Sequence, residues 1–256
     1  MKRQILQALS LLGRIAKATK RAFAFNYCFW ATQEDVAKIR EVEEAVWGDN
    51  AASIGQIQSR ITMHPQGNII LAVNHKQQRK IIGYVSAQRI HDISGERFSW
   101  AEITDNGFIK KTHQPNGSFI YGVNLSVLPT DRSAHLGELL ISFAFTEAVK
   151  RNIKGVFLGA RIPAFKRYKK KHPSSTAREY LLLKHRGVAY DPELRFYEKS
   201  GFQFLKVLPE YFPDPPSLNY GVLCYLKNPF FNNPIRKIIA WLLKIKILLD
   251  IKKALG

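Results

Sequence analysis

The fold of this 256-residue chain is decided by residues 124–137, NLSVLPTDRSAHLG. Alternating apolar residues over 118–127 predict a strand that ends before Pro129, and helical spacing over 136–151 predicts a helix. A turn that runs directly into a helix exposes unpaired N–H groups, and these groups together with the helix dipole attract anions. Arg132 adds a side chain that can bind phosphate through two hydrogen bonds. The junction predicts a pyrophosphate site, although a solvated turn before a surface helix is the commoner outcome.

Strands and helices alternate on both sides of this junction. Period-two patterns predict strands at 26–31, 68–73, 80–90, 98–104, 118–127, 155–160, 202–208 and 221–226. Helical spacing and capping residues predict helices at 32–47, 136–151, 176–185 and 191–201. This order predicts an α/β (α+β) domain with a mixed sheet and helices on both faces.

Basic amphipathic segments lie at both ends of the chain. Six of the first 25 residues are basic and none is acidic, and residues 231–256 carry six basic residues and one acidic residue. The predicted organisation is a helix at 1–25, a central domain at 26–230 and a helix at 231–256. Each terminal helix would lie on a membrane surface or pack on the domain, because amphipathicity is compatible with both.

The net charge of +19 attracts acidic partners but does not choose among them. The densest basic run, residues 166–172, contains a single aromatic residue, whereas nucleic-acid surfaces interleave aromatics with charge. We therefore expect no nucleic-acid partner and a solvated loop at 166–172, with a docking patch for an acidic carrier or peptide as the alternative.

The two cysteines, Cys28 and Cys224, are too few for a disulfide framework and form no zinc-binding pair. No stretch approaches the roughly 18 uninterrupted apolar residues of a spanning helix. We expect a cytoplasmic protein without a metal, either free or peripheral at the inner face of the membrane.

The junction at 124–137 resembles the pyrophosphate-binding motif of the GNAT superfamily of N-acetyltransferases. Downstream, the run FYEKSGF at 196–202 is similar to the second GNAT signature, FYxxxGF, and stands at the expected distance. Residues 117–230 look most like the GNAT domain that precedes a carbon–nitrogen hydrolase domain in some bacterial proteins. The resemblance implies a mixed, mostly antiparallel sheet of six to seven strands.

The same resemblance implies where a donor thioester binds. Backbone groups of Leu125, Ser126 and Val127 would pair with the pantetheine arm. The pyrophosphate would bind at the N–H groups of Arg132, Ser133, Ala134, His135, Leu136 and Gly137. Tyr197 would stand near the thioester sulfur as the general acid for the departing thiolate. For the proton of the attacking amine, the positions of residues on the predicted strands and loop leave four candidates, Glu102, Asn124, Ser126 and His135, and no spacing singles one out.

One position departs from the family pattern, because His135 replaces the first glycine of the loop. A histidine there would add a phosphate donor or, since a positive φ is uncommon for it, crowd the loop. Both acyl-CoA and a phosphopantetheinyl acyl-carrier protein therefore remain as donors.

The implied function is an N-acyltransferase. It would move an acetyl or longer fatty acyl group from the thioester of acetyl-CoA, a longer acyl-CoA or a carrier protein to a primary amine by direct attack. A lysine or ornithine side chain of a peptide or protein is one such acceptor. The alternative is a non-catalytic acyl-CoA-binding or membrane-docking module with the same fold.

Overall fold

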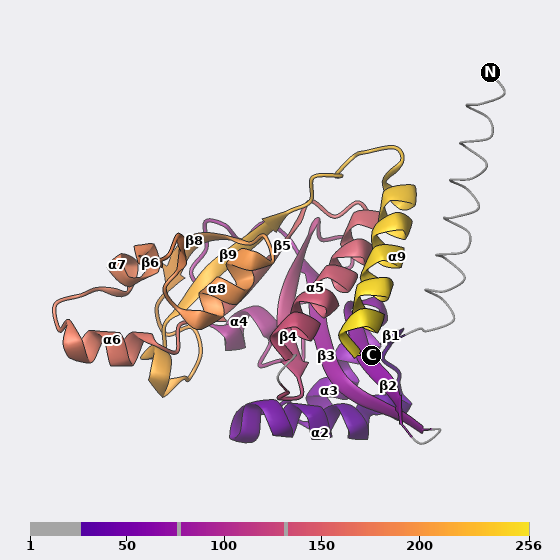
Figure 1. The fold of residues 1–256 in the computed structure, drawn as a ribbon, viewed down its shortest axis with the longest axis horizontal. Helices are drawn as coiled ribbons and strands as arrows, with labels where there is room; N and C mark the ends of the chain where they lie inside the picture. The colour runs from indigo at the N-terminus through magenta and orange to yellow at the C-terminus, as the bar shows by residue number, and fades with distance from the viewer. Residues whose placement is uncertain (1–26, 76–77, 131–132, 256) are drawn as a thin grey trace.

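The computed structural model describes residues 27–75, 78–130 and 133–255, which fold around one large sheet (Figure 1). Seven strands of this described part form the sheet in the order β1-β2-β3-β4-β5-β9-β8. Only β4 and β5 run parallel among them. The mixed, mostly antiparallel sheet predicted from the sequence is confirmed. The strands are β1 (Cys28–Trp30), β2 (Asn68–His75), β3 (Gln78–Ile90), β4 (Phe119–Val127), β5 (Gly155–Arg161), β8 (Gln203–Leu208) and β9 (Gly221–Lys227).

Strands β4 and β5 pair over only part of their length. Their register runs from Phe119↔Gly155 to Gly122↔Leu158 and stops there. Beyond it, β4 remains paired with β3 up to Val127, and β5 remains paired with β9 up to Arg161. The β3–β4 register shifts between Ser86 and Ala87, and such a bulge bends a strand and increases its twist. The two parallel strands therefore part in the middle of the sheet.

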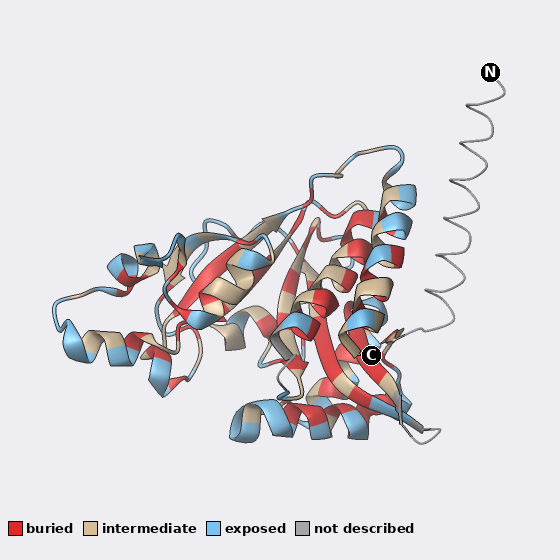
Figure 2. Cartoon of the chain, in the orientation of Figure 1, coloured by how far each residue is buried: buried red, intermediate tan, exposed pale blue. Residues whose placement is uncertain are grey.

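One face of the sheet is covered by α5 (Ser133–Lys150) and α9 (Arg236–Leu255), which run side by side (Figure 1). Buried residues of both helices form one core cluster with side chains of β1, β2 and β3. These contacts bury the second half of α9, as the red bands on that helix in Figure 2 show. The C-terminal segment predicted at 231–256 contains α9, and the second half of this helix packs on the domain.

The opposite face carries α2 (Val36–Trp47) and α3 (Ile54–Met63). A capping box of Thr32 and Asp35 precedes α2, as the sequence predicts. Helix α3 was not predicted, although Ser53 and Gln56 form a capping box at its start. At the far end of the sheet lie α6 (Phe165–Lys171), α7 (Ala177–Leu182) and α8 (Pro192–Lys199).

Three local predictions are wrong. Residues 98–104 are not a strand, because Ser99 and Glu102 form a capping box that starts the short helix α4 (Trp100–Thr104). The basic run at 166–172 is not a loop but lies mostly within α6. The helix predicted at 176–185 ends at Leu182, since Lys184 and His185 form β6, which pairs with β7 (Val188–Ala189).

The N-terminal helix predicted at 1–25 lies outside the described residues. No described helix is both long enough and apolar enough to cross a membrane.

The packing of α9 can be tested by truncating side chains on its two faces. Ile251 is 0% exposed, so Ile251→Ala should lower the free energy of unfolding by about 2–4 kcal/mol through lost burial and a residual cavity. Ile238→Ala on the same helix is the matched control, since Ile238 is 57% exposed and its loss should change stability by less than about 0.5 kcal/mol. Urea denaturation measures both, and equal effects would contradict the packing.

Candidate active site

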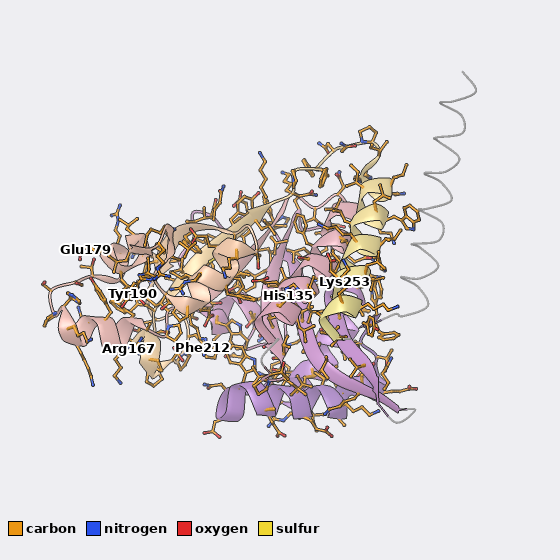
Figure 3. All side chains as sticks on the ribbon, in the orientation of Figure 1. His135, Arg167, Glu179, Tyr190, Phe212 and Lys253 are labelled. Atoms are coloured by element: carbon orange, nitrogen blue, oxygen red, sulfur yellow. The ribbon has the colours of Figure 1, made fainter. Side chains whose placement is uncertain are left out.

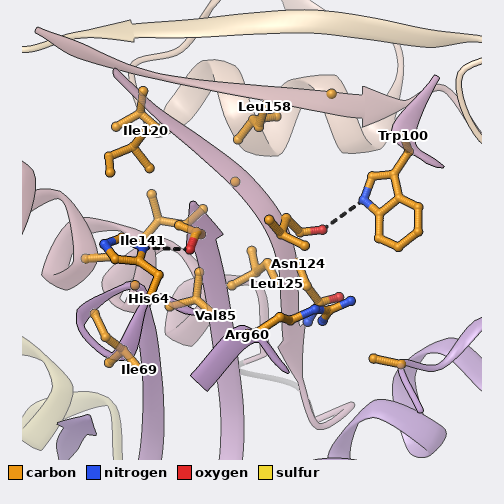
Figure 4. A pocket seen from close by; sticks show the side chains of 18 of the residues that line it. Arg60, His64, Ile69, Val85, Trp100, Ile120, Asn124, Leu125, Ile141 and Leu158 are labelled. Carbon is orange, nitrogen blue, oxygen red and sulfur yellow. Dashed lines mark hydrogen bonds between the residues drawn. The ribbon is translucent and has the colours of Figure 1, made fainter. Parts of the chain in front are cut away.

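The parting of β4 and β5 opens into a cavity of about 670 Å³. One wall comes from the α2 face of the sheet and includes Glu43, Trp47 and Asn124. The other comes from the α5 face and includes Leu125 and Ile141. Figure 4 shows several lining side chains pointing toward the space between the strands, among them Ile120, Asn124, Ile141 and Leu158. The cavity is therefore lined from both faces of the sheet.

The two sequence motifs meet beside this cavity. Gly137 lies in the first turns of α5, and a Cβ built on it would stand 3.2 Å from Cζ of Phe196 on α8. A side chain at position 137 would push the Phe196 ring away, so the glycine permits close packing of the two helices. Helix α8 is held at its start by Asp191, whose side chain accepts hydrogen bonds from the N–H groups of Glu193 and Leu194. Tyr197, the next residue after Phe196, lines the cavity.

The Tyr197 ring packs edge-on against Phe196 and Phe202, with ring centroids 5.1 and 5.6 Å away. Within the described part of the chain, its hydroxyl has no hydrogen-bond partner. Burial raises the pKa of Tyr197 well above its usual value, and the nearby Glu193 carboxylate adds to the shift. The phenol therefore keeps its proton at neutral pH, as a proton donor must.

Glu193 lies one helical turn before Tyr197 on the same face of α8 and also lines the cavity. Its Oε1 accepts a hydrogen bond from the backbone N–H of Arg161 at 3.0 Å, and its Oε2 lies 3.2 Å from Nη2 of Arg161. Burial nevertheless raises the pKa of Glu193 to about 7, although the Arg161 guanidinium opposes the shift. A carboxyl group with this pKa can exchange a proton near neutral pH.

Arg161 is fixed by three neighbours at the end of β5. Besides Glu193, it pairs with Asp214 at 3.3 Å, and its guanidinium carbon lies 4.5 Å from the ring centroid of Trp47. Trp47 in turn contacts Phe212 edge-on. These contacts link α2, β5 and the loop before β9 around one side of the cavity.

A second polar group centres on Glu43 of α2, which is buried. Its Oε1 accepts hydrogen bonds from Nδ2 of Asn124 and Oγ of Ser126, both at 2.6 Å. Ser126 also accepts from the indole N–H of Trp47 at 2.8 Å. Since both N–H bonds of the Asn124 amide are donated, to Glu43 and to Ser126 at 3.0 Å, its carbonyl oxygen is left to accept a bond from a ligand.

Tyr211 closes the cavity from the β9 side. Its ring lies across β5 and β9, where a Cβ on Gly159 or Gly221 would stand only 2.1 or 2.4 Å from ring atoms. The two glycines thus make room for the ring. Its hydroxyl hydrogen-bonds the Tyr121 hydroxyl at 2.7 Å.

The predicted donor residues fall along β4 and the start of α5. Leu125 and Val127 pack their side chains toward α5, while the backbone of 125–127 pairs with β3 on one edge only. Helix α5 begins at Ser133, so its first turn contains Ser133, Ala134, His135 and Leu136. Arg132 lies outside the described residues.

His135 does not take the positive φ considered from the sequence. It lies within α5, and its largely exposed ring stands 3.8 Å from the Glu138 carboxylate. The replacement of glycine therefore does not distort the start of this helix.

Glu102 stands apart from the other candidates. It is fully exposed and does not line the cavity, and its carboxylate accepts hydrogen bonds from the backbone and hydroxyl of Ser99, both at 2.8 Å. These bonds lower its pKa. The structure gives Glu102 a capping contact, and it has no place in the mechanism proposed below.

Sequence reasoning missed Glu43, Trp47 and Glu193 as cavity residues. Glu193 could have been predicted from the sequence, because it precedes Tyr197 by four residues on a predicted helix and therefore lies on the same face as Tyr197. Glu43 and Trp47 belong to a helix distant in sequence, and only the fold brings them to β4.

No family model matches the chain. A Bacillus subtilis protein named as an uncharacterized N-acetyltransferase, YkwB, is 32% identical over 190 residues, which cover 74% of this chain and 78% of the relative. The chain belongs to the GNAT superfamily. A second B. subtilis relative, named as a probable hydrolase, YhcX, is 34% identical over 58% of this GNAT chain and only 29% of its own length.

Solved structures share the fold. The loading GNATL domain of CurA from Lyngbya majuscula has a TM-score of 0.68 at 24% identity, covering 79% of this chain and 98% of that domain. A GNAT-like decarboxylase, GphF, solved with isobutyryl-CoA, has a TM-score of 0.65 at 23% identity, covering 79% and 99%. At these identities the likeness shows the GNAT fold alone.

Proposed function

We propose that this GNAT protein is an N-acyltransferase that moves an acyl group from a thioester to a primary amine. The observation that supports the proposal is the cavity at the point where β4 and β5 part, because Tyr197, Glu193 and the β4 residues Asn124 and Leu125 all line it. The donor is acyl-CoA or an acyl-carrier protein. The acceptor is a small amine or a lysine or ornithine side chain of a peptide.

The donor would lie on the α5 face. Its pantetheine arm would add to the backbone edge of residues 125–127, where β5 has turned away. Its pyrophosphate would bind the N–H groups at 133–137, because the first four N–H groups of a helix lack partners within the helix and carry its positive dipole end. Arg132, next to this turn, would supply a further phosphate contact.

The proposed chemistry is a direct attack. The amine forms the new C–N bond, the C–S bond breaks, and the Tyr197 hydroxyl protonates the departing thiolate. Glu193 accepts the proton that the amine loses, directly or through one water. Asn124 orients the amine through its carbonyl oxygen, while Ser126 and Glu43 hold the Asn124 amide in place.

The cavity also favours a donor with an acyl chain longer than acetyl. On the α5 face its lining includes the apolar side chains of Ile69, Val85, Ile120, Ile141 and Ala144, and Figure 4 shows the first four. His64 and His113 line this region with stacked rings, and burial lowers the pKa of His113 to about 4. An uncharged imidazole at neutral pH adds no buried charge beside an apolar chain. The charged groups that also line this region are Arg89, Glu147 and Arg151.

Tyr197→Phe tests the function directly. Removing the proton donor should lower kcat by about 100-fold or more while donor affinity stays nearly unchanged, since the ring keeps its packing. Thiol release on addition of amine to acetyl-, octanoyl- and palmitoyl-CoA measures turnover, and we expect a longer chain to react faster than acetyl. Calorimetry measures donor binding.

Two outcomes of this assay would contradict the proposal. Equal turnover by the wild-type and Tyr197→Phe proteins would remove Tyr197 from the chemistry. A wild-type protein that binds acyl-CoA yet transfers to no amine would instead be the non-catalytic binding module.

The pH dependence tests Glu193. Because a base must be deprotonated, kcat/KM should rise with pH through about 7, the pKa of Glu193 in the folded protein. Glu193→Gln should abolish this rise and most of the rate, and Glu193→Asp should retain a rise. An unchanged pH profile in Glu193→Gln would place the base elsewhere.

We also propose peripheral contact with the inner face of the membrane through the first half of α9. Ile238, Trp241 and Leu242 are exposed there, and Ile235 is exposed just before the helix, next to the basic Arg236 and Lys237. Apolar side chains flanked by cations suit an anionic interface. The protein should float with phosphatidylserine vesicles, and Trp241→Ser with Ile238→Ser should weaken this at least threefold, given about 1 kcal/mol or more of lost apolar burial. Equal flotation of both proteins would exclude this surface.

A further inference from the structure

Arg60 of α3 is a buried cation in the wall of the cavity (Figure 4). Its side chain is 1% exposed. Nε donates to the carbonyl of Gly107 at 2.7 Å, but the buried Nη1 has no hydrogen-bond partner. Among the described residues, no carboxylate lies within 4 Å of the guanidinium. An ionised group held in this way is strongly destabilising unless something neutralises it.

The other cavity arginines are compensated. Arg161 pairs with Glu193 and Asp214, and Arg151 lies 3.8 Å from Glu147. Arg89 has no carboxylate within 4 Å in the described part of the chain, but it is partly exposed to water. Arg60 is therefore the fully buried arginine of the cavity that has no carboxylate within ion-pair distance among the described residues. The buried Glu43 carboxylate acts on the same Tyr84 hydroxyl as Arg60 but does not pair with the guanidinium.

Its surroundings contain a second unsatisfied group. The Ser86 hydroxyl is buried without a partner, and Ser86 stands opposite Asn124 in the β3–β4 register. Both Arg60 and Ser86 approach the oxygen of the Tyr84 hydroxyl, which donates its own proton to Oδ1 of Asn68 at 2.6 Å, but neither reaches good hydrogen-bond geometry with it. Buried polar atoms are nearly always hydrogen-bonded in native proteins, so two such atoms in one region point to a missing polar ligand or ordered water.

We propose that Arg60 binds a carboxylate of the acceptor, so that the acceptor is an amine which also carries a carboxyl group, such as an amino acid. The inference rests on the proposed transferase function. Arg60 belongs to the α2–α3 face of the sheet, opposite α5 and the proposed pyrophosphate site. A ligand that reaches it therefore enters from the acceptor side. A guanidinium is suited to hold a carboxylate in a fixed orientation.

The test compares matched acceptors with the wild-type protein. Several amino acids are each assayed beside their carboxamides, with octanoyl-CoA as donor. We expect kcat/KM to favour the free acid by about tenfold or more, as charge-assisted hydrogen bonds are strong in a buried site. The amide has the less basic amine, so a preference for the acid cannot arise from amine ionisation.

Two variants assign the preference to a residue. Arg60→Gln should reduce the ratio of acid to amide to about one, while Arg89→Gln, which removes another cavity cation, should keep it. Both rates in the ratio are measured on the same sample, so the ratio does not change if only part of the Arg60→Gln protein is folded. If that variant does not fold at all, the ratio of acid to amide in the wild-type protein still tests whether the acceptor carries a carboxylate.

A second experiment tests whether Arg60 instead binds a carboxylate on the acyl group of the donor. Binding of succinyl-CoA and butyryl-CoA is compared by calorimetry in wild-type and Arg60→Gln proteins. A preference for succinyl-CoA that depends on Arg60, without an acid preference among amines, would overturn the acceptor assignment. Transfer to acids and amides at equal rates would overturn the inference while leaving the transferase function intact, whereas failure of all donors to bind would remove the function itself.

Discussion

The backbone bonds between β4 and β5 end at Gly122 and Leu158, and the rest of the site depends on that loss of pairing. A buried strand edge without a partner leaves N–H and C=O groups unsatisfied, which is costly in the middle of a sheet. The extra residue near Val123 turns β4 away, and Trp100 donates its indole N–H to the Val123 carbonyl at 3.0 Å. The backbone N–H and C=O groups of residues 125–127 that face away from β3 are left for a ligand with amide groups of its own. Pantetheine is such a ligand.

The walls of this opening are fixed by contacts between elements far apart in sequence. Gly137 admits Phe196, and Gly159 and Gly221 admit Tyr211, so two aromatic rings close the gaps that parted strands would leave. The ion pair of Arg161 and Glu193 joins β5 to α8 next to Tyr197. Apolar packing and paired charges thus hold a large cavity open. Arg60 is the buried cation of this cavity that has no carboxylate partner within 4 Å among the described residues, and we assign it to a ligand.

Much of this fold could be predicted from the sequence because its signals are local. The strand before Pro129, the capping box at Thr32 and the cap at Asp191 depend on neighbouring residues. The strand predicted at 98–104 is wrong because its alternating apolar residues also fit one turn of a helix. The capping box of Ser99 and Glu102 favours the helix. Of the cavity residues, Tyr197 and Asn124 were proposed from the sequence. Glu43 and Arg60 were not, because only long-range contacts bring them to the cavity.

The account is tested most directly by a crystal structure of the protein with a non-hydrolysable thioether analogue of octanoyl-CoA. It predicts pantetheine paired with the backbone of 125–127, pyrophosphate at the first turn of α5, sulfur beside the Tyr197 hydroxyl and the octanoyl chain among the apolar side chains that line the cavity on the α5 face. A ligand bound elsewhere, with the space between β4 and β5 left empty, would contradict it.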